Sequence, residues 1–183
     1  SNFFISRGLI VRKKKVLFLC TGNSCRSQMA ESILRESGSD RFDSNSAGSQ
    51  PNKEKFPSTA GVHPMALSTL KANNCPVDNL SSKSWDTFIH DQDSIDFVIT
   101  LCGDAHSEMS DEGCPFFPGK SIRAHWGLDD PDKAKGNDEE IKQVFQNAFE
   151  IIKKRVVAFL ALDMDTLSEQ EIMSEVNKIG NIS

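Results

Sequence analysis

A cysteine and an arginine in one short loop are the strongest sign of chemistry in this sequence. Cys20 directly follows the apolar run 16–19, and Arg26 comes after it in the segment C-T-G-N-S-C-R-S of residues 20–27. If this loop folds back on itself, its backbone N–H groups point inward and form a nest for a tetrahedral anion. Arg26 can bind two of the anion's oxygens, and the N-terminal end of a following helix adds positive potential. The pattern predicts an oxyanion site.

The same loop supplies a nucleophile. The positive potential favours the thiolate form of Cys20, which can attack a bound anion at neutral pH, and Ser27 can donate a hydrogen bond to that thiolate. The other interpretation of Cys20 is a buried small side chain at a strand end, but the glycine, asparagine and arginine that follow it favour the nucleophile. The loop residues expected to hold the anion are Thr21, Gly22, Asn23, Ser24, Cys25 and Arg26.

An aspartate far along the chain is a candidate general acid. Asp130 lies in the segment W-G-L-D-D-P of residues 126–131. An aspartate before a proline is ordinary turn chemistry, and Asp129 is a competing carboxylate. Downstream of a loop like 20–27, however, such an aspartate is typical of a general acid that protonates a departing oxygen. We predict that Asp130 has this role.

Two further cysteines indicate redox chemistry. Cys102 ends the apolar segment 95–101, and Cys114 lies in the long loop 103–121. If the strands that end in Cys20 and Cys102 are neighbours in one sheet, the two sulfurs can come close. Three thiols in series can pass a disulfide outward by exchange. If both additional cysteines were incidental, the chain would be a simple phosphatase.

The remaining cysteines and the histidines do not form a second pattern. Cys25 is expected to be structural and Cys75 a bystander, and the five cysteines include no Cys-x-x-Cys pair. This odd number argues against a disulfide framework. The four histidines are scattered, which argues against a zinc site.

The elements that must position these residues alternate between strand and helix. That alternation predicts an α/β domain with a parallel sheet, whose ligands bind at the carboxyl ends of the strands. We place Gly38 at a helix C-terminal cap and Asn137 and Ser168 at N-terminal caps. The expected strands are 16–20, 41–47, 95–101 and 122–126, and the expected helices are 27–37, 64–74, 84–90, 138–161 and 168–178.

Composition indicates one globular domain of 183 residues, with 26% charged residues and a net charge of −5. The negative charge argues against a nucleic-acid partner. The apolar residues 3–5 are interrupted by Arg7, and the chain contains no 18-residue apolar run. We therefore expect no membrane association and a cytoplasmic protein. Separately, we expect a monomer. The expected organisation is a lead-in over 1–14, the main domain over 15–161 and a helical tail over 162–183.

The segment C-T-G-N-S-C-R-S-Q-M-A-E at residues 20–31 resembles the reactive loop of arsenate reductases built on the low-molecular-weight tyrosine phosphatase fold. The resemblance covers about residues 15–160 and implies an α/β three-layer sandwich with a central, mainly parallel four-stranded sheet flanked by helices. The motifs that match in the same order are Ser46–Gly48, Thr100–Cys102, Cys114–Pro115 and His125–Pro131.

This resemblance implies a reaction. Arsenate would bind the 20–27 loop, Cys20 would attack arsenic, and Asp130 would protonate the departing oxygen. Cys102 would then attack Cys20, arsenite would leave, and Cys114 would attack Cys102 to leave a 102–114 disulfide. Such enzymes hold no tightly bound cofactor and depend on an external thiol reductant. In some relatives a potassium ion lies behind the loop, and the matching positions here are Asn23, Glu31, Ser46 and Asp86.

Differences from the better-known thioredoxin-linked relatives leave alternatives open. The loop between Cys102 and Cys114 and the segment 50–64 are longer than in those relatives, so the reductant is either thioredoxin or glutathione with glutaredoxin. A tyrosine phosphatase using Cys20, Arg26 and Asp130 is the second hypothesis. Phosphatases of this fold commonly carry aromatic residues after the Asp-Pro pair, whereas Asp132 follows here. The third hypothesis is a non-catalytic oxyanion sensor or binding module.

Overall fold

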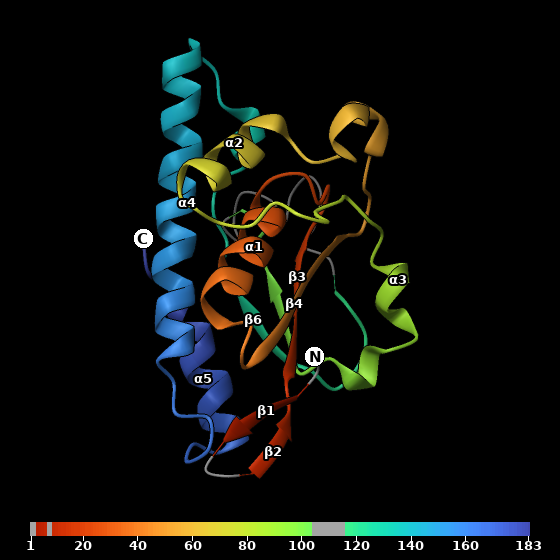
Figure 1. The fold of residues 1–183 in the computed structure, drawn as a ribbon, viewed down its shortest axis with the longest axis vertical. Coiled ribbons are helices and arrows are strands. Elements are labelled where there is room, and N and C mark those ends of the chain that lie inside the picture. The colour runs from red at the N-terminus through yellow and green to blue at the C-terminus, as the bar shows by residue number, and fades with distance from the viewer. Residues whose placement is uncertain (1–2, 7–8, 104–115) are drawn as a thin grey trace.

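The computed structural model describes residues 3–6, 9–103 and 116–183. Its centre is a sheet of four parallel strands in the order β4-β3-β5-β6 (Figure 1). The expected four-stranded sheet flanked by helices is confirmed, and all of its strand pairs are parallel. The strands are β3 (Lys14–Cys20), β4 (Phe42–Gly48), β5 (Phe97–Thr100) and β6 (Ile122–His125).

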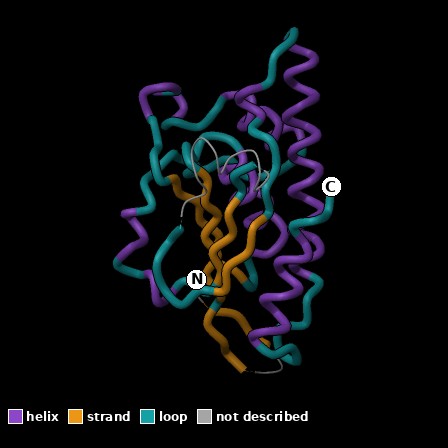
Figure 2. The backbone as a smooth tube through the Cα atoms, turned by 180° about the vertical axis from the view of Figure 1, so that it is seen from behind, coloured by secondary structure: helices purple, strands orange, loops and turns teal. Residues whose placement is uncertain are grey.

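Helices cover the two faces of this sheet unequally. The larger hydrophobic cluster joins one face to four helices, and a smaller cluster joins the other face to α3 and to Phe117. Figure 2 shows from behind how the long helices stand on one side of the strands. The helices of the thick layer are α1 (Arg26–Gly38), α2 (Pro64–Ala72), α4 (Asp138–Leu160) and α5 (Glu169–Ile179), and α3 is Asp86–Ile89.

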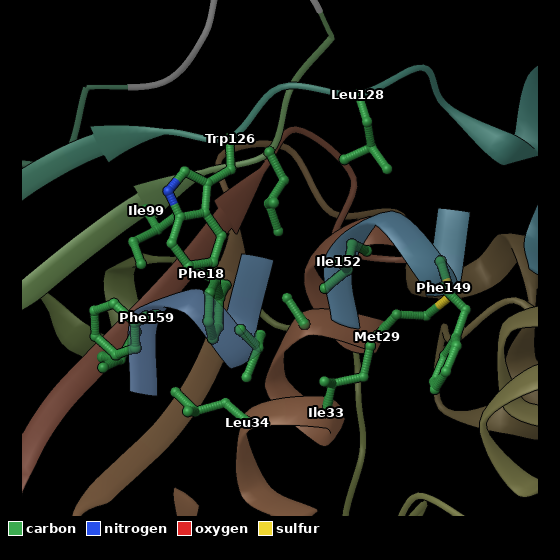
Figure 3. Packing of buried hydrophobic residues seen from close by; sticks show 14 of the residues in the cluster. Phe18, Met29, Ile33, Leu34, Ile99, Trp126, Leu128, Phe149, Ile152 and Phe159 are labelled. Carbon is green, nitrogen blue, oxygen red and sulfur yellow. The ribbon is translucent and has the colours of Figure 1, made fainter. Parts of the chain in front are cut away.

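Strand β3 is buried on both faces, which explains its continuous apolar sequence. Because side chains alternate along a strand, Val16 and Phe18 join the larger cluster while Leu17 and Leu19 join the smaller one. The ring of Phe18 packs 6.1 Å from that of Trp126 (Figure 3). This burial anchors the strand whose last residue begins the 20–27 loop.

An antiparallel hairpin precedes the sheet. Strands β1 (Phe3–Ser6) and β2 (Leu9–Arg12) pair with each other, although the sequence analysis assigned no strand to residues 1–14. The apolar runs in this segment, at residues 3–5 and 9–11, are only three residues long, which is too short to predict a strand from the sequence. Arg12 connects the hairpin to the domain because its guanidinium lies 3.4 Å from the Asp96 carboxylate.

One expected cap is wrong, and two are present. Gly38 is the last residue of α1 and does not cap it, because Ser39 holds that place in a right-handed helical conformation. A side chain at Gly38 would lie 2.8 Å from Leu160, so the glycine permits the close approach of α1 and α4. Asn137 and Ser168 form the capping boxes that open α4 and α5.

Helix α5 lies along the outer edge of β6. The indole Nε1 of Trp126 donates a hydrogen bond of 2.9 Å to the Val176 carbonyl, and Asn177 Nδ2 donates one of 3.0 Å to the Arg123 carbonyl. A Cβ at Gly180 would lie only 2.2 Å from the His125 carbonyl oxygen. Residues from the expected tail over 162–183 are therefore packed on the sheet domain.

The buried side chain of Arg155, in α4, contacts both the loop after β6 and Ile182 near the C-terminus. Its guanidinium donates to the carbonyls of Trp126 and Gly127 at 2.6 and 3.2 Å, and its Nε donates to the Ile182 carbonyl at 2.9 Å. Burial lowers the pKa of Arg155. Among the residues that the structure describes, no helix is both long and apolar enough to cross a bilayer.

Candidate active site

The loop between β3 and α1 presents unpaired backbone donors at the carboxyl end of the sheet. Cys20 is buried at 3% exposure, and Arg26 opens α1. The backbone N–H groups of Gly22, Ser24 and Cys25 donate to no acceptor within the described residues. Asn23 has a φ of 52°, a left-handed conformation that asparagine tolerates better than most residues. The loop thus has the donors that a tetrahedral anion needs.

Two groups of the loop lie within hydrogen-bond distance of the Cys20 sulfur. The Asn23 backbone N–H lies 3.1 Å from the sulfur, and Ser27 Oγ lies 2.9 Å from it. Ser27 Oγ also accepts a hydrogen bond of 2.7 Å from Asn23 Nδ2. Because that lone pair is occupied, the hydroxyl hydrogen of Ser27 is available to the sulfur. Ser27 is placed where the sequence predicted a donor to the thiolate.

A buried polar network supports the loop from behind. Asn23 Nδ2 also donates to Ser46 Oγ at 3.0 Å, and Ser46 Oγ donates to Glu31 Oε1 at 2.7 Å. Glu31, at 1% exposure, is also hydrogen bonded to Arg35 and lies 3.8 Å from the Lys83 ammonium. The Lys83 backbone N–H donates to Asn23 Oδ1 at 2.9 Å. This network fixes the amide that orients Ser27.

The potassium site expected from the resemblance does not match this arrangement. The oxygens of Asn23, Ser46 and Glu31 already accept hydrogen bonds from the protein, and Lys83 places a positive charge beside Glu31. Asp86 is exposed at the start of α3. In this arrangement the four residues therefore do not form a potassium site.

Arg26 and Asp130 meet at the mouth of the loop. Arg26 is 4% exposed, and its guanidinium donates to the Leu128 carbonyl at 3.0 Å and lies 3.7 Å from Asp130 Oδ2. Asp130 Oδ1 accepts the Asp132 backbone N–H at 3.0 Å. Asp129, the competing carboxylate, is exposed and does not line the pocket. The structure thus places Asp130 beside the predicted anion site.

These groups line a pocket of about 250 Å³. All the residues predicted to hold the anion contribute to it, together with Cys20 and Asp130. Four other lining residues were not predicted, because nothing in their local sequence indicates that segment 50–55 approaches the loop after Asp130. These residues are Gln50, Asn52, Lys55 and Asp132.

Cys102 lies at the same edge of the sheet as Cys20. Strands β3 and β5 are neighbours in a register that pairs Leu19 with Thr100. Cys20 is the last residue of β3, and Cys102 follows the end of β5. Cys102 is fully buried. The Gly103 carbonyl can only accept a hydrogen bond, so His125 Nε2 donates to it at 3.1 Å, and His125 Nδ1 lies 2.7 Å from the Thr100 hydroxyl.

The other cysteines have different positions. Burial raises the pKa of the Cys25 thiol, so this residue stays a neutral thiol in the loop. Cys75 is buried away from the pocket, at the end of α2, and burial raises its pKa as well. Cys114 lies outside the described residues.

Adding one methyl group to Gly48 should disrupt the anion loop. In Gly48→Ala the new Cβ would lie 2.6 Å from the Thr21 carbonyl oxygen and 3.1 Å from the Asn23 nitrogen. Both are backbone atoms, so the loop must shift. We expect phosphate affinity, measured by calorimetry, to fall roughly tenfold or more, as small displacements of a binding loop can produce. A folded variant with wild-type affinity would contradict this close packing.

Comparison with known proteins places the chain in a family. The family model for low molecular weight phosphotyrosine protein phosphatase matches residues 15–172. The chain belongs to this phosphatase family. It is 40% identical over 147 residues to an arsenate reductase of Shouchella clausii (strain KSM-K16), covering 80% of this chain and 95% of that protein. It is 38% identical over 149 residues to an arsenate reductase of Halalkalibacterium halodurans, covering 81% of this chain and 96% of that protein.

Solved structures of the phosphatase family agree with these relatives. An arsenate reductase in its phosphate-binding state superimposes with a TM-score of 0.59 at 29% identity, covering 81% of this chain and 97% of that one. A thioredoxin-dependent arsenate reductase of Corynebacterium glutamicum gives a TM-score of 0.50 at 27% identity, covering 79% of this chain and 62% of that one. The resemblance stated from the motifs is confirmed at the level of the family.

Proposed function

We propose that this member of the phosphatase family reduces arsenate to arsenite. The observation that carries the proposal is the position of Cys102, which follows the strand next to the one ending in Cys20, at the edge that holds the anion loop. A phosphatase has no use for a second thiol at this place. The names of the relatives support the same activity.

The first step is attack of the Cys20 thiolate on arsenic. Arsenate would be held by the free N–H groups of the loop and by Arg26. A sulfur–arsenic bond forms, an arsenic–oxygen bond breaks, and Asp130 gives its proton to the departing oxygen, which leaves as water. Ser27 and the Asn23 backbone N–H hold the Cys20 sulfur in place before attack.

The second step moves two electrons to arsenic. The Cys102 thiolate attacks the Cys20 sulfur, the sulfur–arsenic bond breaks, and its electron pair stays on arsenic as arsenite is released. Cys114 then attacks Cys102, which frees Cys20 and leaves a 102–114 disulfide. The net reaction consumes arsenate and two thiols and yields arsenite, water and one disulfide.

An external thiol completes the cycle. We propose thioredoxin as the first reductant to test, since a structural neighbour is thioredoxin-dependent, with glutathione and glutaredoxin as the second. A relay that must be re-reduced after every turnover functions in a reducing compartment, in keeping with the expected cytoplasmic location. The monomeric state remains a prediction that light scattering would check.

The deciding experiment is arsenate-dependent consumption of NADPH with thioredoxin and thioredoxin reductase. Sustained consumption would support a thioredoxin-coupled reductase. Activity only after exchange for glutathione, glutaredoxin and glutathione reductase would identify the other reductant. Hydrolysis of aryl phosphates without arsenate reduction would favour the phosphatase, and oxyanion binding without either reaction would favour the sensor.

Replacing Cys102 with serine separates reductase from phosphatase. In Cys102→Ser the arseno-thiol on Cys20 still forms but cannot be resolved through the relay, so we expect steady-state arsenate reduction to fall at least about 100-fold. Hydrolysis of an aryl phosphate, which needs only Cys20, Arg26 and Asp130, should be unaffected. The matched control Cys75→Ser should retain both activities. Undiminished arsenate reduction by Cys102→Ser would rule out the relay.

A further inference from the structure

Lys55 reaches across the mouth of the pocket to the loop that carries Asp130. Its ammonium is hydrogen bonded to Asp132 Oδ2, in an ion pair that joins the segment before α2 to the turn after β6. This ion pair raises the pKa of Lys55. The ammonium also lies 5.4 Å from the centre of the Phe56 ring, within reach of a cation–π contact.

His63 holds the second oxygen of the same carboxylate. Its Nδ1 accepts the Met65 backbone N–H at 3.0 Å, so the proton of the neutral ring is on Nε2. Nε2 lies 3.2 Å from Asp132 Oδ1 and donates to it. Burial lowers the pKa of His63, which favours this neutral form. The ring is fixed between those of Phe56 and Phe145, at 4.7 and 4.8 Å.

Asp132 in turn positions Asp130. Its backbone N–H donates to Asp130 Oδ1 at 3.0 Å, and Asp130 caps the short turn Pro131–Lys133. The other oxygen of Asp130 faces Arg26 at 3.7 Å. Lys55 and His63 each bind one oxygen of the Asp132 carboxylate. The turn is therefore fixed in a position that keeps Asp130 beside the anion loop.

We propose that Lys55, His63 and Asp132 form a clamp that positions Asp130 over the bound anion. Lys55 is a positioning residue in this arrangement and acts through Asp132, while Arg26 and the loop bind the anion itself. The inference rests on the proposed function in one respect, namely that Asp130 is the general acid. Neither Lys55 nor His63 was identified by the sequence analysis.

Lys55→Met tests the clamp, with Lys53→Met as its control. Lys53 belongs to the same short turn, is exposed, and forms no ion pair within the described residues. We expect kcat/KM for arsenate to fall roughly three- to fivefold in Lys55→Met, the range for a partly exposed ion pair, and to stay at the wild-type value in Lys53→Met and in Lys55→Arg. In an Asp130→Asn background, Lys55→Met should cause no further loss.

A persistent loss in the Asp130→Asn background would overturn the proposal, because Lys55 would then act on the anion directly. A second readout does not depend on activity. The backbone N–H groups of Asp132, Lys133 and Ala134 are hydrogen bonded within the turn, and their hydrogen exchange should accelerate in Lys55→Met but not in Lys53→Met. Unchanged exchange would also overturn the clamp. If the wild type reduced no arsenate, the proposed function would fail while the exchange result still decided the clamp.

Discussion

We expect replacement of Cys20 with serine to abolish arsenate reduction and to leave oxyanion binding nearly intact. The serine hydroxyl is not ionised at neutral pH, so no sulfur–arsenic bond forms, and we expect turnover to fall by roughly 10⁴-fold or more. The loop donors and Arg26 remain in place, so phosphate affinity should stay within a few-fold of the wild-type value. Coupled NADPH consumption and calorimetric titration with phosphate measure the two effects separately.

The matched control for this substitution is Cys25→Ser, a neighbouring buried cysteine whose thiol stays protonated. It should keep most of the turnover, since only its backbone is expected to contribute to the loop. Turnover in Cys20→Ser within tenfold of the wild type would show that a different thiol begins the reaction.

The largest effect on stability is expected for Trp126→Ala. Trp126 is fully buried, its ring lies 6.1 Å from Phe18 and 5.9 Å from Phe159, and its indole N–H is bonded to the Val176 carbonyl. Loss of a buried tryptophan leaves a cavity and removes about 3–5 kcal/mol from the free energy of unfolding. Denaturation with guanidinium chloride, followed by circular dichroism, measures this change.

The second tryptophan is the comparison for this variant. Trp85 is partly exposed and packs against the smaller cluster, 6.0 Å from Phe117. We expect Trp85→Ala to cost less than half as much as Trp126→Ala, because less apolar surface is lost from the interior. Equal losses would show that the two faces of the sheet contribute alike, contrary to the unequal layers.

Local patterns predicted the parts of the site that lie close together in the sequence. The loop 20–27 and the helix after it follow from an apolar strand, a glycine and an arginine in a continuous segment, and the structure places them as expected. The sequence also indicated that Cys20 and Cys102 lie at the same edge of the sheet, because parallel strands end at one edge. It left open whether their strands are neighbours, and the structure shows that they are.

Contacts between distant segments could not be predicted in this way. Lys55 and Asp132 are exposed or partly exposed charged residues, and nothing in their local sequences indicates that they pair across 77 positions. Gly38 illustrates a different failure: its place at a helix end suggested a cap, whereas packing against Leu160 decides its role. The buried polar network behind Asn23 likewise depends on residues from four separate elements or loops.

Helix α5 also covers the free edge of β6, the last strand of the sheet. In a parallel edge strand, alternate carbonyl groups point away from the neighbouring strand, and such a row is a template for pairing with another chain. Here the outward carbonyl of Arg123 accepts a hydrogen bond from the Asn177 side-chain amide. The outward carbonyl of His125 is covered by Gly180, which packs directly against it. The C-terminal helix therefore closes an edge that would otherwise be open to strand addition, and the protein gains protection against self-association on that side.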